Sequence, residues 1–211
     1  MQNKILQFTK DELFIEKYFE ETGNKSYVLK EEEDSGKSTL EVMCNSECSL
    51  CIRNLDSKEK NVNLSFFRTG SKLGLCKRVD HIVFEQISEE QWNAHLIEMK
   101  SGIENLEKWY DIKGKFRASY FIVRAMVAIL HIEIKTFYFY TTYEHANILT
   151  RETNISSRKV RTGEKIVNPK DEWEKGYIMM NLGEKIRFDH FPVEMKRIDG
   201  ILEGKLQLRK G

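Results

Sequence analysis

The stretch from residue 93 to residue 144 most constrains the fold, because its periodicity changes twice. NAHLIEMK (93–100) reads as a strand, and after Ser101 and Gly102 the segment 103–132 is rich in Leu, Ile, Phe, Ala and Met at helical spacing, with Gly114 as an expected interruption. IKTFYFYTTYE (134–144) then returns to the β-branched and aromatic residues typical of strands. A strand, a long helix and a second strand predict an α/β or α+β sandwich in which the helix packs on the sheet.

The rest of the chain supplies further elements. KDELFIEKYFEET (10–22) places apolar residues at helical spacing and predicts a helix, whereas KEEEDSGKS (30–38) predicts a charged loop. Strands are expected at 39–44, 62–68 and 78–85. Pro169 and Pro192 are the only prolines, and no Gly/Ser-rich linker divides the chain, which indicates one domain over 1–211.

Charge and hydropathy exclude some classes of function. The formal net charge is +1, which argues against the global basic field of a histone-like binder. Contacts to nucleic acid would therefore be local, and the basic residues of the segment 158–170 (Arg158, Lys159, Arg161 and Lys165) and of the tail 205–210 are the candidates, with a solvated surface as the alternative. The chain has no apolar run long enough to span a membrane and no secretory leader pattern, so we expect a cytoplasmic protein without a membrane partner.

The charges of two neighbouring strands form the candidate site. Side chains alternate across a strand, so Glu98 and Lys100 share one face, and Asp80 lies on the preceding expected strand where the two carboxylates can converge. Two close carboxylates repel each other unless a cation lies between them, and oxygen ligands of this kind suit Mg²⁺. A lysine beside such an ion could orient a water and stabilise charge on a phosphate, which together describes hydrolysis of a phosphodiester.

Two alternatives accompany this interpretation. The three charged residues could form an ion-paired strand pair on an exposed sheet face, although a sheet covered by the long apolar helix should have little exposed face. A second Glu-x-Lys, Glu133 and Lys135, lies where the helix passes into a strand, but no strand bearing an aspartate precedes it at short range. We interpret it as a surface ion pair.

Asp80, then Glu98-Met99-Lys100 after an apolar strand and before a long helix, resembles the PD-(D/E)xK nuclease superfamily, although no proline precedes Asp80. The resemblance covers about residues 10–145, with 146–211 as a C-terminal extension. It implies a restriction-endonuclease-like α/β core, in which a mixed central sheet is flanked by helices. In this core Asp80 and Glu98 would bind Mg²⁺ or Mn²⁺, the Met99 carbonyl would add a third oxygen, and Lys100 would be the catalytic lysine.

The resemblance also implies a function. It predicts a metal-dependent hydrolase that cuts nucleic acid, DNA in preference to RNA, as an effector of a prokaryotic defence or mobile-element system. The expected partner is a second copy of the chain, in a homodimer, or a protein of such a system, and another protein or a ligand would control cutting. Some members add an acidic residue from the first helix or strand, and Glu12, Glu16 and Glu41 are the candidates in this chain.

The cysteines suggest a second metal. Cys44, Cys48, Cys51 and Cys76 all fall within a short part of the chain, a clustering that favours metal over disulfides in a cytoplasmic protein. Zn²⁺ is preferred over an iron–sulfur cluster, because the cysteines of nucleases that hold such a cluster typically bracket the core. The alternative is that all four are free cysteines in or near the core.

Two rival functions remain open from the sequence. One is a catalytically inactive, zinc-stabilised interaction module of the same fold, and the other is an adaptor that binds nucleic acid through residues 158–170. The histidines, including His81 and His95, show no ligand spacing, and strand alternation directs these two away from their acidic neighbours. The aromatic residues between 137 and 143 are interpreted as core packing rather than as a platform for bases.

Overall fold

The computed structural model describes residues 18–22, 25–33, 36–56, 77–130, 132–148 and 167–210. In chain order the strands and helices of this part of the chain are β1 (Phe19–Thr22), β2 (Ser26–Glu33), β3 (Gly36–Met43), β4 (Ser49–Ile52), β5 (His81–Gln86), β6 (Gln91–Glu98), β7 (Gly102–Ile103), α2 (Leu106–Leu130), β8 (Glu133–Tyr143), β9 (His145–Ala146), α3 (Pro169–Glu174), β10 (Tyr177–Asn181), β11 (Lys185–Glu194), β12 (Lys196–Ile198) and β13 (Ile201–Gln207). The expected strand, helix and strand of the segment 93–144 are confirmed as β6, α2 and β8, and α2 continues through Gly114.

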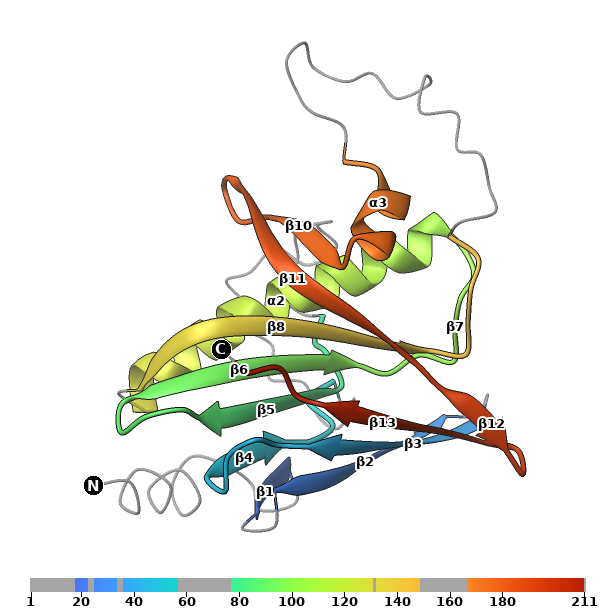
Figure 1. Cartoon of the computed structure of the whole chain (residues 1–211). Helices are drawn as coiled ribbons and strands as arrows, with labels where there is room; N and C mark the ends of the chain where they lie inside the picture. Colours follow the sequence, from blue (N-terminus) through green and yellow to red (C-terminus); the bar gives the residue numbers. More distant parts are fainter. Residues whose placement is uncertain are drawn as a thin grey trace.

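A seven-stranded mixed sheet organises the molecule, in the order β1-β4-β5-β6-β8-β11-β10 (Figure 1). The strands β4, β5 and β6 pair antiparallel, whereas β6 and β8 are parallel and are joined through α2. A parallel pair needs such a crossover connection, which explains why the long helix follows β6 directly. The α/β class is therefore confirmed.

Helix α2 covers one face of this sheet. Its buried residues Trp109, Ile112, Phe116, Val123 and Val127 recur every three, four or seven positions and so form one apolar stripe. The stripe packs on residues of β5, β6 and β8, with the rings of Phe116 and Phe139 in edge contact at 5.1 Å. Burial of this stripe, rather than intrinsic propensity, holds the 25-residue helix in place.

A second sheet covers the other face, where a helix was expected. It has four strands in the order β12-β13-β3-β2 (Figure 1). Its apolar residues Tyr27, Leu29, Leu40 and Val42 pack against the face of the seven-stranded sheet that carries Val83, Ile97, Tyr138 and Tyr140. The prediction of a central sheet flanked by helices is thus wrong for this face, because an unforeseen β-sandwich layer buries it.

Two predictions of local structure are also wrong. The segment 30–38, expected to be a loop, lies mainly in the paired strands β2 and β3, where Lys30, Glu32 and Lys37 are exposed. The predicted helix 10–22 ends in strand β1 over its described residues, while its beginning and the strand expected at 62–68 lie outside the described residues. Strand β4 was not foreseen because its four buried residues show no alternation.

The C-terminal part of the chain connects the two sheets. Strand β11 pairs in parallel with β8 and in a hairpin with β10, and the chain then passes through β12 into β13, which pairs in parallel with β3 (Figure 1). Asp199 and Gly200 both have positive φ, the conformation of a two-residue hairpin turn that suits an Asp-Gly pair. None of the helices that the structure describes is long and apolar enough to cross a membrane.

Candidate functional site

The candidate site lies where β5 begins and β6 ends. His81 pairs with Ile97 across these antiparallel strands, and continuation of this register sets Asp80 opposite Glu98. Glu98 shares the face of β6 that carries Leu96, the face covered by α2. The backbone nitrogen of Met99 donates a hydrogen bond of 2.6 Å to Asp80 Oδ2, which fixes this carboxylate against the strand end. The predicted convergence of Asp80 and Glu98 is present.

Lys100 also reaches the cluster. Its Nζ lies 2.9 Å from Glu98 Oε1 and 4.0 Å from Asp80 Oδ2, and it donates a hydrogen bond of 2.7 Å to the Met99 carbonyl. Thr142 of β8 holds the backbone at this point, because its Oγ1 accepts from Lys100 N at 2.9 Å and donates to Lys100 O at 3.2 Å. The lysine is therefore anchored by both neighbouring strands.

A second lysine, which the sequence analysis missed, comes from helix α2. Lys115 Nζ lies 2.7 Å from Glu98 Oε1 and 3.5 Å from Asp80 Oδ1. Its position carries a signal that could have identified it, since Lys115 falls three residues after Ile112, on the buried stripe of an apolar helix. A lysine at a buried position is expected to have an anionic partner.

Glu98 is the most unusual member of the cluster. It is 0% exposed, and its Oε1 lies 2.9 Å from Lys100 Nζ and 2.7 Å from Lys115 Nζ. Its Oε2 has no hydrogen-bond partner among the residues that the structure describes. Burial, and then the nearby Asp80 carboxylate, raise the pKa of Glu98 to about 7. A buried carboxylate oxygen without a partner is uncommon and marks Glu98 as a candidate functional residue.

The carboxylates in turn act on the two lysines. Burial alone would lower the pKa of Lys100, but Glu98 and Asp80 together raise it above its ordinary value. The same balance raises the pKa of Lys115. Both ammonium groups therefore stay charged at neutral pH and offset the negative charge of the two carboxylates.

Two further carboxylates border the cluster. Asp56 Oδ2 lies 3.6 Å from Lys115 Nζ, and Glu31 Oε1 of β2 lies 3.9 Å from Lys100 Nζ. Burial and the neighbouring Asp80 raise the pKa of Asp56. Sequence reasoning could not find either residue, because one lies in a turn and the other in a strand of the second sheet.

Of the three candidates for an additional acidic residue, Glu41 alone lies in the described part of the chain. Glu41 pairs with Lys205 at 2.8 Å on the outside of the second sheet, so it is not part of the cluster. Glu12 and Glu16 lie outside the described residues. Glu133 and Lys135 are both exposed at the start of β8, in agreement with a surface role.

The donor atoms of the cluster fit a hard divalent cation. Asp80, Glu98 and the Met99 carbonyl offer only oxygen, and the partnerless Oε2 of Glu98 is an orphaned buried acceptor. No group of three or more His, Cys, Asp and Glu side chains in the described residues is arranged to hold a metal ion. An ion at this site would thus depend on two carboxylates, a carbonyl and water, a ligand set that Mg²⁺ commonly accepts.

The cysteines lie apart from this cluster. Cys44 and Cys51 are free and buried in the core between the two sheets, and burial raises the pKa of the Cys44 thiol to about 11. Burial likewise raises the pKa of Cys51. Their burial in this core agrees with a packing role. Cys76 lies outside the described residues, so the four-cysteine zinc site remains a prediction.

The remaining residues considered from the sequence are histidines, aromatic residues of β8 and basic residues of the segment 158–170. His95 stacks on Tyr138 at 5.1 Å between ring centroids, and its Nε2 lies 3.6 Å from Glu85 Oε2, in the core opposite Glu98. Buried aromatic residues of β8 (Phe137, Tyr138, Phe139 and Tyr140) form core contacts, as expected. The basic residues Arg158, Lys159, Arg161 and Lys165 lie outside the described residues, so their predicted role remains a prediction.

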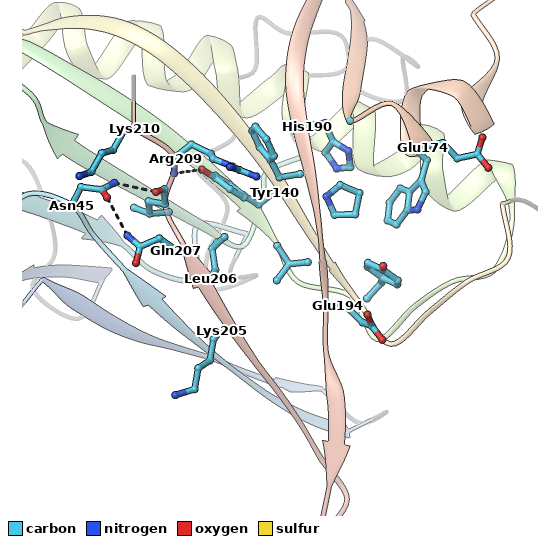
Figure 2. A pocket seen from close by; sticks show the side chains of 17 residues that line it. Asn45, Tyr140, Glu174, His190, Glu194, Lys205, Leu206, Gln207, Arg209 and Lys210 are labelled. Carbon is cyan, nitrogen blue, oxygen red and sulfur yellow. Dashed lines mark hydrogen bonds between the residues drawn. The ribbon is translucent and has the colours of Figure 1, made fainter.

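A groove of about 1090 Å³ lies between β11 and β13, where the two sheets diverge (Figure 2). Its walls are tied by hydrogen bonds from Asn45 Nδ2 to the Leu208 carbonyl at 3.0 Å and from Arg209 N to Tyr140 Oη at 3.2 Å. The guanidinium of Arg209 lies over the Phe191 ring, 4.7 Å from its centroid. Asp80, Glu98, Lys100 and Lys115 do not line this groove.

No protein-family model, no curated protein and no solved structure matches this chain. The geometry of the Asp80, Glu98, Lys100 and Lys115 cluster therefore carries the functional argument.

Proposed function

We propose that the protein is a metal-dependent nuclease that hydrolyses phosphodiester bonds, with DNA as the preferred substrate. One observation carries the proposal: the fully buried Glu98 lies beside Asp80 and two lysines, yet keeps an oxygen without a partner. An ion-paired cluster that served only stability would be expected to satisfy this oxygen. A site that binds a cation would leave this oxygen without a protein partner until the cation is bound.

The connectivity around the cluster supports the proposal. Antiparallel strands β4, β5 and β6 are followed by α2 and by β8, which is parallel to β6. This order matches the three strands, helix and strand that the resemblance to PD-(D/E)xK nucleases implies. The resemblance implies an aspartate on the second of these strands and the Glu-x-Lys on the third; Asp80 lies one residue before the second strand, and Glu98 ends the third.

Each residue then has a chemical role. Asp80, Glu98 and the Met99 carbonyl would hold Mg²⁺ or Mn²⁺, which when bound lowers the pKa of a water and stabilises charge on the phosphate. Lys100, 15% exposed at the edge of the cluster, would position the attacking water or neutralise a phosphate oxygen. Lys115 would keep the two carboxylates together through its charge, because it contacts both.

The test is cleavage of single-stranded and double-stranded DNA and RNA with Mg²⁺ or Mn²⁺. Wild type, Glu98→Ala and Lys100→Ala are compared after circular dichroism has confirmed that each is folded. Cutting that needs the divalent ion and is lost in both variants would support the proposal. Cutting that both variants retain, or its absence under every condition, would overturn it and favour the interaction module.

A further inference from the structure

A second, smaller pocket adjoins the cluster at Lys100. Its volume is about 180 Å³, and Lys37 of β3, Lys100, Lys108 of α2 and Arg197 of β12 contribute to its lining. Lys37, the segment from Lys100 to Lys108, and Arg197 are three parts of the chain that lie far apart in sequence. Glu31 and Glu104 also line the pocket, so cationic residues outnumber acidic ones there. The volume is below the roughly 300–1,000 Å³ of pockets that enclose whole drug-sized ligands, which favours a small anionic group as occupant.

Arg197 contributes to the pocket a guanidinium whose charge is paired with the Glu144 carboxylate. Its Nε and Nη2 donate to the two carboxylate oxygens of Glu144 at 3.1 and 2.8 Å, and its Nη1 donates to the Gly200 carbonyl at 3.0 Å. The guanidinium is thus held at the β12–β13 hairpin by three hydrogen bonds. A preorganised guanidinium suits recognition of phosphate oxygens.

Lys108 and Lys37 provide the free charge. Lys108 Nζ makes no ion pair or hydrogen bond with the other residues that the structure describes, and Lys37 has only a long, solvent-exposed contact of 3.7 Å with Glu32. Lys108 also lies in the first turn of α2, where the Asn105 side chain accepts from Lys108 N at 2.9 Å. The positive end of a long helix adds to the attraction for an anion.

We infer that this pocket binds a phosphate group of the nucleic-acid strand, next to the phosphate that the cluster would cut. The inference rests on the proposed nuclease function, which supplies the nucleic acid, and adds a binding subsite built from β3, α2 and β12. Lys100 belongs to both places, because it lines the pocket and contacts Glu98. A strand that enters past Lys108 and Arg197 would therefore present its neighbouring phosphate to the cluster.

The test measures binding without cutting. A labelled single-stranded oligonucleotide is titrated in EDTA, at several salt concentrations, with Glu98→Gln protein and with the same protein carrying Lys37→Gln and Lys108→Gln. The two added changes should weaken binding and lower the slope of log affinity against log salt by about 0.7, the value for one neutralised phosphate of a single strand.

A matched control carries Lys30→Gln and Lys196→Gln, two exposed lysines on β2 and β12 that do not line the pocket. It should bind as the Glu98→Gln parent does. An equal loss in the control, no loss in the pocket variant, or no binding by the parent would each overturn the inference.

The phosphate could be terminal or internal, and the same titration distinguishes them with 5′-phosphorylated, 5′-hydroxyl and circular strands. A loss confined to the phosphorylated strand identifies a terminal phosphate, and an equal loss on all three identifies an internal one. Because EDTA prevents metal-dependent cutting, this titration tests binding by the pocket separately from the nuclease activity. A wild-type protein that binds the strand through the pocket but never cuts it would refute the nuclease function and leave the phosphate-binding pocket in place.

Discussion

Two glutamates, Glu98 and Glu172, are both 0% exposed and both contact a lysine of α2, but their surroundings differ. Glu172 Oε1 receives Lys113 Nζ at 2.6 Å and Met179 N at 2.7 Å, and its Oε2 receives Trp109 Nε1 at 3.1 Å. Both oxygens of Glu172 are therefore satisfied. Glu98 has ion pairs on one oxygen and no hydrogen-bond partner in the described structure on the other.

The difference separates a structural carboxylate from a candidate functional one. Lys113 and Lys115 are two positions apart and so point to different sides of the helix, one toward each glutamate. The same residue types on the same helix thus form one closed network, which links α2 to α3 and β10, and one open network at the ends of two strands. Buried polar groups without partners are costly, so we expect the network around Glu98, and not the one around Glu172, to bind a ligand.

The largest expected effect is on cleavage. Glu98→Gln keeps the shape of the side chain but removes the charge that would bind the cation, so we expect the cutting rate to fall by about a thousandfold or more. Glu172→Gln should keep cutting within about threefold, because this residue contacts no part of the cluster. A fluorescent cleavage assay on folded proteins compares the two variants. Equal losses of cutting rate would show that Glu98 is no more important for cleavage than Glu172.

Stability should respond in the opposite order. Glu172→Ala leaves Lys113 and the Trp109 indole without their buried partner, and we expect a loss of about 3 kcal/mol in the free energy of unfolding. Glu98→Gln should cost less than about 1 kcal/mol, or stabilise the protein, because Asp80 still faces both lysines. Urea unfolding in EDTA measures both values, and a larger loss for Glu98→Gln would contradict the account.

The pH dependence of stability offers a third comparison. The pKa of Glu98 is raised from 4.5 to about 7, so the folded state binds more protons than the unfolded state between these values. Stability in EDTA should therefore fall as pH rises from about 4.5 to 7, by an amount on the order of 2 kcal/mol. Glu98→Gln should abolish this part of the pH profile, whereas Glu172→Gln should retain it; a wild-type profile that rises with pH over this range would count against the open carboxylate.

The smallest expected effect concerns Lys115. Its removal in Lys115→Gln should lower cutting by about tenfold, because Lys115 is proposed to hold the two carboxylates together while Lys100 acts on the water or the phosphate. Steady-state rates at several Mg²⁺ concentrations provide the test. A loss as large as that of Lys100→Ala would instead give Lys115 a direct role in the reaction.

Local patterns predicted the part of the site that local structure builds. Asp80, Glu98 and Lys100 were found because strand alternation and a short connection between β5 and β6 bring them together. Lys115, Asp56 and Glu31 were missed, since their approach depends on how α2, a turn and the second sheet pack around that strand pair.

The second sheet was unpredictable for a related reason. Strand β13 pairs with β3 across more than 150 residues, as in the register of Gln207 with Met43, and no local periodicity encodes such a partner. The charged outer face of β2 also concealed a strand whose inner residues, Tyr27 and Leu29, are buried. Local charge suggested a loop where tertiary packing forms a sheet.

The central claim is that Glu98, whose Oε2 has no hydrogen-bond partner in the described structure, binds a divalent cation. Titration calorimetry with Mn²⁺ in the absence of nucleic acid tests this claim most directly. The account predicts a binding site in wild type that is lost in Glu98→Gln and kept in Glu172→Gln. Binding that survives in Glu98→Gln, or no binding by the folded wild type, would contradict it.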